Sequence, residues 1–486
     1  MEQKTIVDMM RAALENPGGS FLFLEQLISE ELHRFEESEC FQQMQDAEAY
    51  YRNRSGVQKK TNDVPKRSNT KIEHPILKKL VDQKINYLLA KPWTVSTENE
   101  AYGKVLNDIF NQKFRRRLKA FGRDAVKYGV SYLQPYYTQE GKLDFMLLPP
   151  MQVRPIWMDS AREQLFAFIR SYEIEVYEGL THKPVRVVEF WWDGGMRRYY
   201  ASSVDSGRSI LKPDTTLGDA ENGYTASHLI IGGKPYNWEK VPLIWLRYND
   251  EELPLCYYIK ELIDDINWQT SVTADVLRDI AKFIFILKNY GGADLGEFLR
   301  DLNRHLAIKV SGDGGVDKLE PSLNIDAVMR FLENQRRDLY DYAAAVDTKD
   351  PELGNASGTA INFRYMDLDA DCAAIAAEMQ EAFAQMKIFL DVALQLERKG
   401  NFSKQEFSIV FNMDLPVNET DIINNAKNSK GLISDKTIRE NHPWVEDAED
   451  ERLRMEEEKQ EKMQQYGEGM FGNAFGGDGG DVTDEE

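Results

Sequence analysis

Cysteine is scarce in this chain of 486 residues, and long apolar runs are missing. The three cysteines (Cys40, Cys256 and Cys372) lie far apart without a CxxC pair, which argues against a disulfide framework and suits a reducing compartment. The most apolar short run, residues 283–287, has five residues, where a membrane span needs about twenty. The sequence starts without the basic and apolar stretches of a secretory signal. We therefore expect a soluble, cytoplasmic protein.

Basic residues are in deficit as well. The sequence has 60 Lys and Arg against 81 Asp and Glu, which gives a net charge of −21. A charge of this sign repels phosphate, and most nucleic-acid binders show the opposite balance. Apolar residues make up 42% and aromatic residues 11%, so wholesale disorder is excluded. At about 150 residues per domain, the length suggests about three domains. Composition alone predicts an acidic, mixed α/β protein without affinity for DNA.

Signatures of catalysis are missing from the sequence. Residues 354–359 (GNASGT) lack the lysine with which a phosphate loop reaches its ligand, and a turn before a helix explains them better. The six histidines form no HxxxH pair and have no cysteine at ligand spacing, and GxSxG does not occur. Close carboxylate pairs arise by chance in so acidic a chain. We expect neither an enzyme nor a cofactor.

One pattern has the spacing of a calcium-binding loop. Asp367, Asp369 and Asp371 occupy its positions 1, 3 and 5, and Glu378 occupies position 12. Cys372 replaces the glycine required at position 6, and the residues that follow are strongly helical, so the ligands would point around a helix. Acidic residues that favour the first turn of a helix explain the cluster more simply. The four residues form a weak metal-site candidate, and an acidic metal-dependent enzyme is an alternative hypothesis.

Apolar residues at helical spacing predict helices in the first part of the chain, within 20–53, from 76 to about 90, and over 100–128. The Arg115–Arg117 run is expected on a solvated face of the third helical region. Residues 54–69 are polar, basic and broken by a proline, which predicts a loop or arm.

The pattern of apolar residues changes between residues 130 and 250. Short aromatic and β-branched runs alternate there with glycine-containing turn signals. This pattern predicts several antiparallel strands. Val185–Trp192 and Met196–Ala201 are the best hairpin candidate, because a short Asp-Gly-Gly turn separates them.

Helical patterns return in the second half. The expected segments are a helix at 253–282, an irregular stretch at 283–321 with a possible strand at 307–310, a helix at 323–346, a loop at 347–358, an Ala-rich helix to about 397, a strand at 407–411, charged helices at 418–465 and a disordered acidic tail at 467–486. The pattern therefore places a small insertion between two long helices.

Five short motifs, spread over about residues 45–460, carry a family resemblance. They are N-x-K-I…LVDQK-x-NYL-x-x-KP at 69–92, G-x-S-Y at 129–132, P-x-I…LID-x-x-N…S at 242–271, SG-x-A-I at 357–361, and G-x-I-S-x-x-T…P-x-V-x-D…E at 431–451. In this order they resemble the portal (head–tail connector) proteins of tailed bacteriophages, of the type found in siphophages of Gram-positive hosts. Ala90 stands where a glycine is commoner, and the 54–69 arm and the terminal tail have no counterpart.

The resemblance implies an α+β portal fold with a mainly helical wing, stem and crown, a β-rich wing module and a small α/β clip. The implied segments are wing 1–250, stem helix 251–282, clip 283–321, stem helix 322–346, tunnel loop 347–358, wing helix and strand 359–417, crown 418–466, and a disordered acidic, Gly-rich tail 467–486.

The resemblance also implies a ring at one capsid vertex that serves as the channel for DNA packaging and ejection. The implied partners are other copies of the chain in a dodecamer, double-stranded DNA passing without sequence specificity, the terminase large subunit, a head-completion adaptor, and the major capsid and scaffolding proteins. No membrane is involved, and the ring would be assembled in the host cytoplasm and reside in the virion. Terminase hydrolyses ATP in this family, which agrees with the missing phosphate loop.

Two groups of site residues follow from the resemblance. The tunnel loop would face DNA with Asp347, Thr348, Lys349, Asp350, Glu352, Asn355 and Ser357. The clip would dock terminase and later adaptors with Lys288, Asn289, Tyr290, Asp294, Glu297, Arg300 and Arg304. An acidic channel would let DNA slide, because it repels the duplex over about 8 Å at physiological salt. A helical scaffold or adaptor without a channel, bound through residues 253–346, is the remaining alternative.

Overall fold

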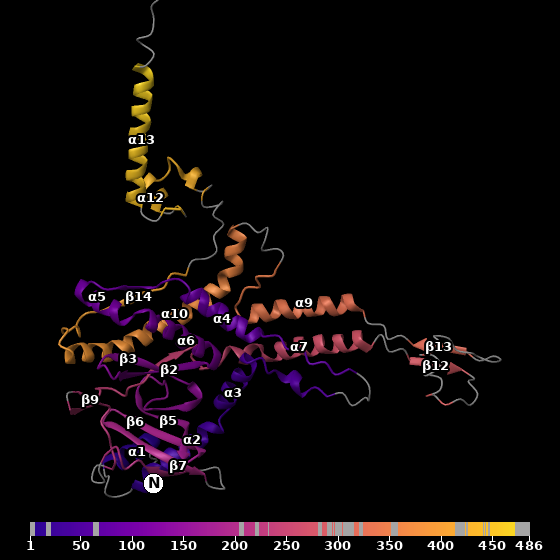
Figure 1. The fold of residues 1–486 in the computed structure, drawn as a ribbon, viewed down its shortest axis with the longest axis vertical. Coiled ribbons are helices and arrows are strands. Elements are labelled where there is room, and N and C mark those ends of the chain that lie inside the picture. Colours follow the sequence, from indigo (N-terminus) through magenta and orange to yellow (C-terminus); the bar gives the residue numbers. More distant parts are fainter. Residues whose placement is uncertain are drawn as a thin grey trace, which may run out of the picture. The chain divides into compact units, whose positions relative to one another are not determined.

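The computed structural model is a chain of two compact units. Residues 1–347 and 367–413 form the core unit, and residues 348–366 and 414–486 form the second unit. The residues described are 5–15, 21–61, 68–203, 209–218, 223–231, 233–279, 284–288, 294, 296, 304, 315–319, 324–350, 358–413, 423, 426–440, 442, 444–445 and 448–471. Helices and sheets are both extensive, so the fold is α+β, as the sequence predicted (Figure 1).

Short polar residues divide the predicted N-terminal helices. The helical residues within 20–53 form α2 (Phe21–Glu36) and α3 (Glu39–Tyr51), because the Ser38 hydroxyl accepts the Phe41 N–H and starts a new helix. Likewise, Asn111 caps a second helix within 100–128 by accepting the N–H groups of Lys113 and Phe114. The remaining helices of this region are α1 (Ile6–Glu15), α4 (Ile76–Leu89), α5 (Glu100–Ile109) and α6 (Gln112–Tyr128).

The predicted β-rich module consists mainly of two antiparallel sheets. The three-stranded sheet has the order β11-β2-β3, and the five-stranded sheet has the order β4-β5-β6-β7-β8. The strands are β2 (Val130–Tyr137), β3 (Leu143–Leu148), β4 (Val153–Trp157), β5 (Leu165–Glu178), β6 (Thr181–Trp192), β7 (Gly195–Ser203), β8 (Ser209–Pro213) and β11 (Ile244–Arg247), with a small pair of β9 (Leu229–Ile231) and β10 (Lys234–Tyr236). The predicted hairpin is confirmed, since Trp192 pairs with Gly195 across a two-residue turn.

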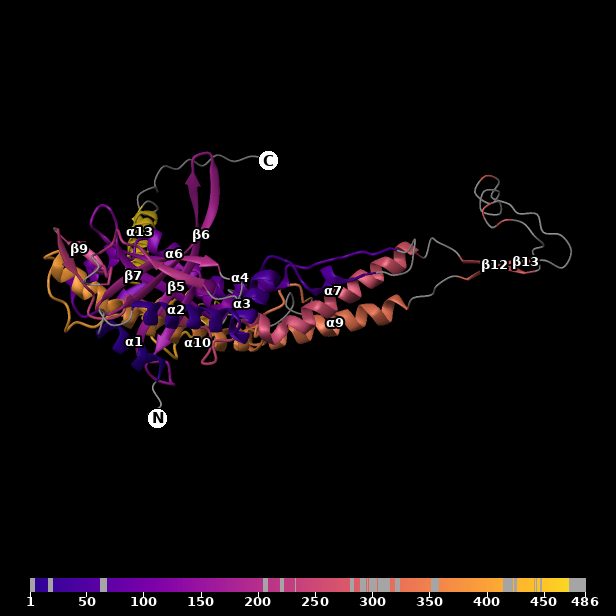
Figure 2. The same ribbon diagram turned by 90° about the horizontal axis from the view of Figure 1, so that it is seen from below.

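Two long helices lie side by side and extend away from the sheets (Figures 1 and 2). They are α7 (Leu255–Asp279) and α9 (Ile325–Tyr342), and the Gln335 amide of α9 donates to Asp265 of α7 at 2.6 Å. Between them in the sequence lies an antiparallel pair of β12 (Ile284–Lys288) and β13 (Gly315–Leu319). The possible strand at 307–310 falls outside the described residues.

The helix predicted at 323–346 is shorter than expected. Asn324 caps α9 by accepting the Ala327 N–H, and the helix ends at Tyr342. The cause is Ala344, whose φ of 45° is left-handed and incompatible with further helical turns. Residues 343–346 therefore leave the helix axis, which matters for the site described below.

The long helix α10 (Gly358–Leu396) packs its apolar residues into the main core beside α4, α5 and α6. Phe383 meets Trp93 and Phe110 edge to face, with ring centroids 5.7 and 5.4 Å apart. The predicted strand near 407–411 is confirmed as β14 (Ser408–Val410), which pairs with β1 (Thr94–Ser96). This cluster of apolar and aromatic side chains joins α10 and β14 to the helices between residues 76 and 128.

The second unit contains the charged helices α12 (Asp435–Glu440) and α13 (Ala448–Phe471), which pack on each other. Helix α13 continues past the predicted tail boundary, so residues 467–471 are helical. Arg452 pairs with Glu449 and Glu456 one turn away on either side, which supports the first half of this polar helix. Residues 472–486 fall outside the described part of the chain.

Candidate functional site

Helix α4 supplies the polar side chains around which the site is built. Its apolar side, which includes Leu80, Val81 and Leu88, is buried in the core. Its polar residues Gln83, Lys84 and Tyr87 point instead at the chain on both sides of residues 348–366. These polar residues belong to the LVDQK-x-NYL motif, which thereby acquires a structural role.

The segment that leaves α9 is held to α4 by three hydrogen bonds. The Gln83 amide donates to the Val346 carbonyl at 2.8 Å and accepts the Val346 N–H at 3.2 Å. The Lys84 ammonium donates to the Ala344 carbonyl at 2.9 Å. The backbone groups freed by the end of α9 are thus satisfied by side chains of α4.

The part of α10 that belongs to the core unit, from Asp367 onward, is also bound by α4. The Lys84 ammonium, fully buried, forms an ion pair with Asp371 at 2.7 Å. The Tyr87 hydroxyl donates to Asp369 at 3.0 Å, and Tyr248 donates to Asp371 at 3.2 Å. Burial and the neighbouring Asp371 raise the pKa of Tyr248 well above its usual value. We call Gln83, Lys84, Tyr87, Asp369 and Asp371 the α4 clamp.

Two acidic residues of the predicted tunnel loop, Asp347 and Asp350, form ion pairs with arginines. The Arg336 guanidinium of α9 binds both carboxylate oxygens of Asp347, one of them at 2.7 Å. Within the second unit, Arg364 of α10 pairs with Asp350. Lys349 is the only basic residue within 347–358, but the flanking helices supply two arginines that a count within the loop misses.

The other predicted tunnel-loop residues are only partly described. Thr348 and Lys349 are exposed at the start of the loop. Glu352, Asn355 and Ser357 lie outside the described residues, as does most of the segment before α10. The DNA-facing role of the loop stays a prediction.

A network that the sequence did not reveal runs along α7. Polar side chains at three- and four-residue spacing on one face of this helix bind residues 55–60 and 68–74, which we call the strap. The bonds run from Gly56 N–H to Asp264 (2.8 Å), Asn267 amide to Ser55 hydroxyl (3.0 Å), Thr70 N–H to Asp275 (2.7 Å), Ile72 N–H to Ser271 (2.9 Å), and Ser68 hydroxyl to Asp279 (2.7 Å). Lys60 and Asp275 form an ion pair that is largely buried. The strap overlaps the arm predicted at 54–69, and it is hydrogen-bonded along one face of α7.

The predicted clip residues are mostly outside the described part of the chain. Lys288 ends β12. Asp294 and Arg304 are exposed, and the Asp294 carboxylate accepts the Gly296 N–H at 3.2 Å. The remaining ones, which are Asn289, Tyr290, Glu297 and Arg300, are not described, so docking through this group stays a prediction.

The calcium-loop candidate lies on helix α10, not on a loop. Successive odd positions of a helix point about 200° apart, so Asp369 and Asp371 face different sides and bind Tyr87 and Lys84 respectively. Burial raises the pKa of Glu378, a full two turns further on. Among the described residues, no group of three or more His, Cys, Asp or Glu side chains is placed to hold a metal ion.

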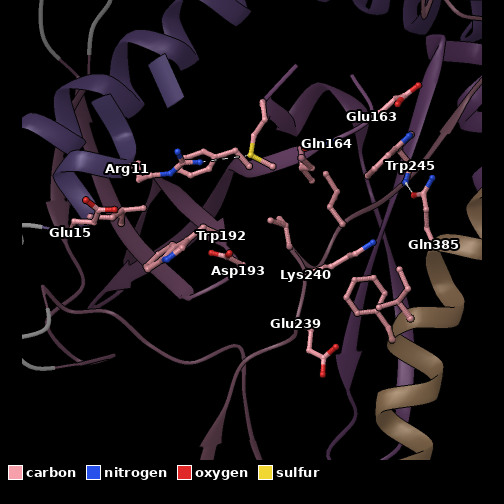
Figure 3. Close-up of a pocket in the computed structure, with 18 residues that line it drawn as sticks. Arg11, Glu15, Glu163, Gln164, Trp192, Asp193, Glu239, Lys240, Trp245 and Gln385 are labelled. Carbon is pink, nitrogen blue, oxygen red and sulfur yellow. Dashed lines mark hydrogen bonds between the residues drawn. The ribbon is translucent and has the colours of Figure 1, made fainter. Parts of the chain in front are cut away.

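A cleft of about 750 Å³ lies between α1, the sheets and α10 (Figure 3). Leu165, Phe166 and other apolar side chains line its walls. Three of its labelled carboxylates, Glu15, Glu163 and Glu239, lie well apart around it (Figure 3). The cleft therefore brings together no acid–base pair from these residues.

A helical hairpin extends from a helical and β-rich body, which agrees with the α+β portal fold that the sequence resemblance implied. The family described as phage portal protein, SPP1 Gp6-like, matches residues 35–465, so the chain belongs to this family. The portal protein of Bacillus phage SPP1 is 29% identical over 424 residues, which cover 86% of this chain and 81% of that protein. The portal protein of Clostridium phage phiCD119 is 24% identical over 442 residues, which cover 86% and 93%.

Membership in this family defines the function. Phage portal proteins are structural components of the virion, and they form the ring at one capsid vertex through which the genome is packaged and ejected and on which terminase docks. Among the described residues, no helix is long and apolar enough to cross a membrane.

Proposed function

We propose that twelve copies of this chain form the ring, that its channel conducts double-stranded DNA without sequence specificity, and that residues 347–358 face the DNA. In this assignment α7 and α9 are the stem, residues 283–321 are the clip, residues 1–250 are the wing, and residues 418–466 are the crown. The terminase large subunit and later a head-completion adaptor dock on the clip, and the wing meets capsid and scaffolding proteins. The chain itself hydrolyses no nucleotide, and the ring assembles in the host cytoplasm.

The α4 clamp is the observation that supports a DNA-facing loop most directly. It holds the chain at Ala344–Val346 before the loop and at Asp369–Asp371 after it. A loop that contacts moving DNA needs fixed ends, because a force applied to the loop would otherwise deform the stem helices. The exposed Thr348 and Lys349 lie directly beyond the first fixed point.

Replacing residues 348–357 by a Gly/Ser linker of equal length tests the loop assignment. Asp347 is kept, because its pair with Arg336 belongs to the stem. We expect negative-stain images to show rings for the wild type and the variant, and DNA packaging with terminase to fail for the variant. A Gly/Ser replacement of Ser160, Ala161 and Glu163, exposed residues in the turn between β4 and β5, serves as the control; Arg162 is kept because it pairs with Glu252. Loss of rings, or unimpaired packaging, would contradict the assignment.

The clip assignment has its own experiment. Changing Lys288, Arg300 and Arg304 together to glutamate reverses three charges in the proposed docking segment. We expect unchanged rings and weaker binding of the terminase large subunit in a pull-down with purified proteins, since reversed charges at an interface slow association and disfavour the complex. Undiminished terminase binding would place the docking site elsewhere.

A further inference from the structure

A strongly basic pocket is present on this acidic protein. The pocket has a volume of about 660 Å³ and lies where the end of α4 meets the start of α6. Five of its lining residues are cationic, and none of the described residues that line it is acidic. The cations are Lys91, Lys113, Arg115, Arg116 and Lys119. The Arg115–Arg117 run, expected on a solvated face, thus lines a concave site with its first two members.

Three of these cations, Arg115, Arg116 and Lys119, form no ion pair with a carboxylate of the described residues. Asp144 forms ion pairs with Lys113 at 2.7 Å and with Arg117, which is outside the pocket. In the part of the chain that the structure describes, no carboxylate lies within ion-pair distance of Arg115, Arg116 or Lys119. In a chain of net charge −21, three adjacent uncompensated cations are a costly arrangement that a bound anion would relieve.

Arg115 is held in place for binding. Its guanidinium lies over the Trp93 ring at 4.6 Å from the centroid. Trp93 is itself fixed by edge-to-face contacts with Phe110 at 5.8 Å and Phe114 at 6.4 Å. A stacked guanidinium keeps its planar fork of N–H donors free for a carboxylate or phosphate, and little side-chain entropy is lost on binding.

From this geometry we propose that the pocket docks an acidic peptide segment of a partner protein. A duplex is about 20 Å wide and binds through many phosphates along an extended basic surface, whereas here the basic residues are confined to one pocket. The net negative charge of the whole chain opposes a long polyanion far more than a short peptide with few carboxylates. Apolar lining from Leu89, Pro92 and Trp93 suits the side chains of a peptide.

The test uses the full chain and a short fluorescein-labelled peptide of Asp, Glu and Gly with one Phe, followed by fluorescence anisotropy. The variant R115Q/R116Q/K119Q removes the three uncompensated cations. The control R54Q/K104Q/K404Q removes three exposed cations elsewhere, with the same change in net charge. We expect the pocket variant to bind the peptide at least about tenfold more weakly than the control does. The peptide with Asn and Gln in place of Asp and Glu should not bind.

A double variant, R116Q/K119Q, keeps the stacked Arg115 and is therefore less disruptive to the fold. Circular dichroism of each variant would detect a folding defect. The double variant should show an intermediate affinity. Equal binding by the pocket variant and the control, or no binding of the acidic peptide to the wild type, would overturn the proposal. Binding of a short DNA duplex that is lost only in the pocket variant, without peptide binding, would identify a nucleic-acid site instead and overturn it too.

Discussion

Lys84 is a fully buried lysine that forms an ion pair with Asp371, whose side chain is 24% exposed. Replacing it with methionine would leave the Asp371 carboxylate with Tyr248 as a hydrogen-bond donor but without its cation, and would remove the hydrogen bond to the Ala344 carbonyl. We expect the free energy of unfolding to fall by about 3 kcal/mol, the lower end of the range for removing one member of a buried ion pair, because Asp371 retains some contact with solvent. Chemical denaturation followed by circular dichroism measures the change.

The control for this substitution is on the same helix. Lys78 pairs with Asp82, but its side chain is 54% exposed, so Lys78→Met should cost about 0–1 kcal/mol. The double variant K84M/D371L removes both charges of the pair and should recover part of the loss. Equal losses for K84M and K78M would show that the clamp is not a stabilising pair.

Asp124 of α6 gives a prediction for pH. Burial, the largest effect, raises the pKa of this carboxyl to about 6, although Lys127 and Arg123 oppose the shift. A carboxyl with a raised pKa destabilises the fold as pH rises from about 4, the unfolded value, through 6. We expect Asp124→Asn to raise the free energy of unfolding by about 2–3 kcal/mol at pH 7.

Denaturation at several pH values checks the sign for Asp124. The advantage of the asparagine variant should shrink below pH 6 and vanish below about pH 4, where both folded and unfolded carboxyls are protonated. An advantage that stays constant over this range would mean that packing, not ionisation, causes it.

At the scale of single residues, the sequence predicted chemistry poorly. The motif that contains Gln83, Lys84 and Tyr87 was found, but its role was not, because its partners lie about 260 or more residues away. Arg336 and Arg364 were missed for a related reason. They pair with Asp347 and Asp350 from the helices that precede and follow the loop in the sequence, which a count of charges along the loop does not include.

At the scale of elements, the strap is held by the polar face of α7. Asp275 of this helix contacts both parts of the strap. This carboxylate pairs with Lys60 and accepts the Thr70 N–H at 2.7 Å. Replacing it with alanine should open the strap locally. We expect faster hydrogen exchange at the Thr70 and Ile72 amides, measured by mass spectrometry, because their side-chain acceptors are lost or displaced.

Glu261→Ala is the matched control for the strap, since this residue is exposed on the same helix. Its exchange pattern over residues 68–74 should equal that of the wild type. If D275A left the exchange of these amides unchanged, the strap would be held by contacts other than the polar face of α7.

Elements were predicted well where periodicity was strong. Helix α4, the β6–β7 hairpin and strand β14 lie where the sequence placed them. The errors concern helix ends. Ser38 and Asn111 break two predicted helices by capping new ones, and Ala344 ends α9 early, because a single residue can change backbone direction without disturbing the apolar pattern around it.

For the whole molecule, the net charge of −21 makes a prediction about DNA in solution. Rings should conduct DNA but not retain it, because their overall field repels phosphate. We expect no complex with a linear duplex in a gel-shift assay at about 0.15 M salt. A complex whose affinity falls steeply with salt would show several phosphate contacts and contradict this expectation.

The α4 clamp has a mechanical consequence. Residues 348–366 belong to a different compact unit from the chain on either side, and α4 grips the core unit's chain just before this segment and just after it. Both ends of the segment are therefore bound to the same helix, α4. A force applied to residues 348–366 would therefore be transmitted at both ends to the same helix of the core unit.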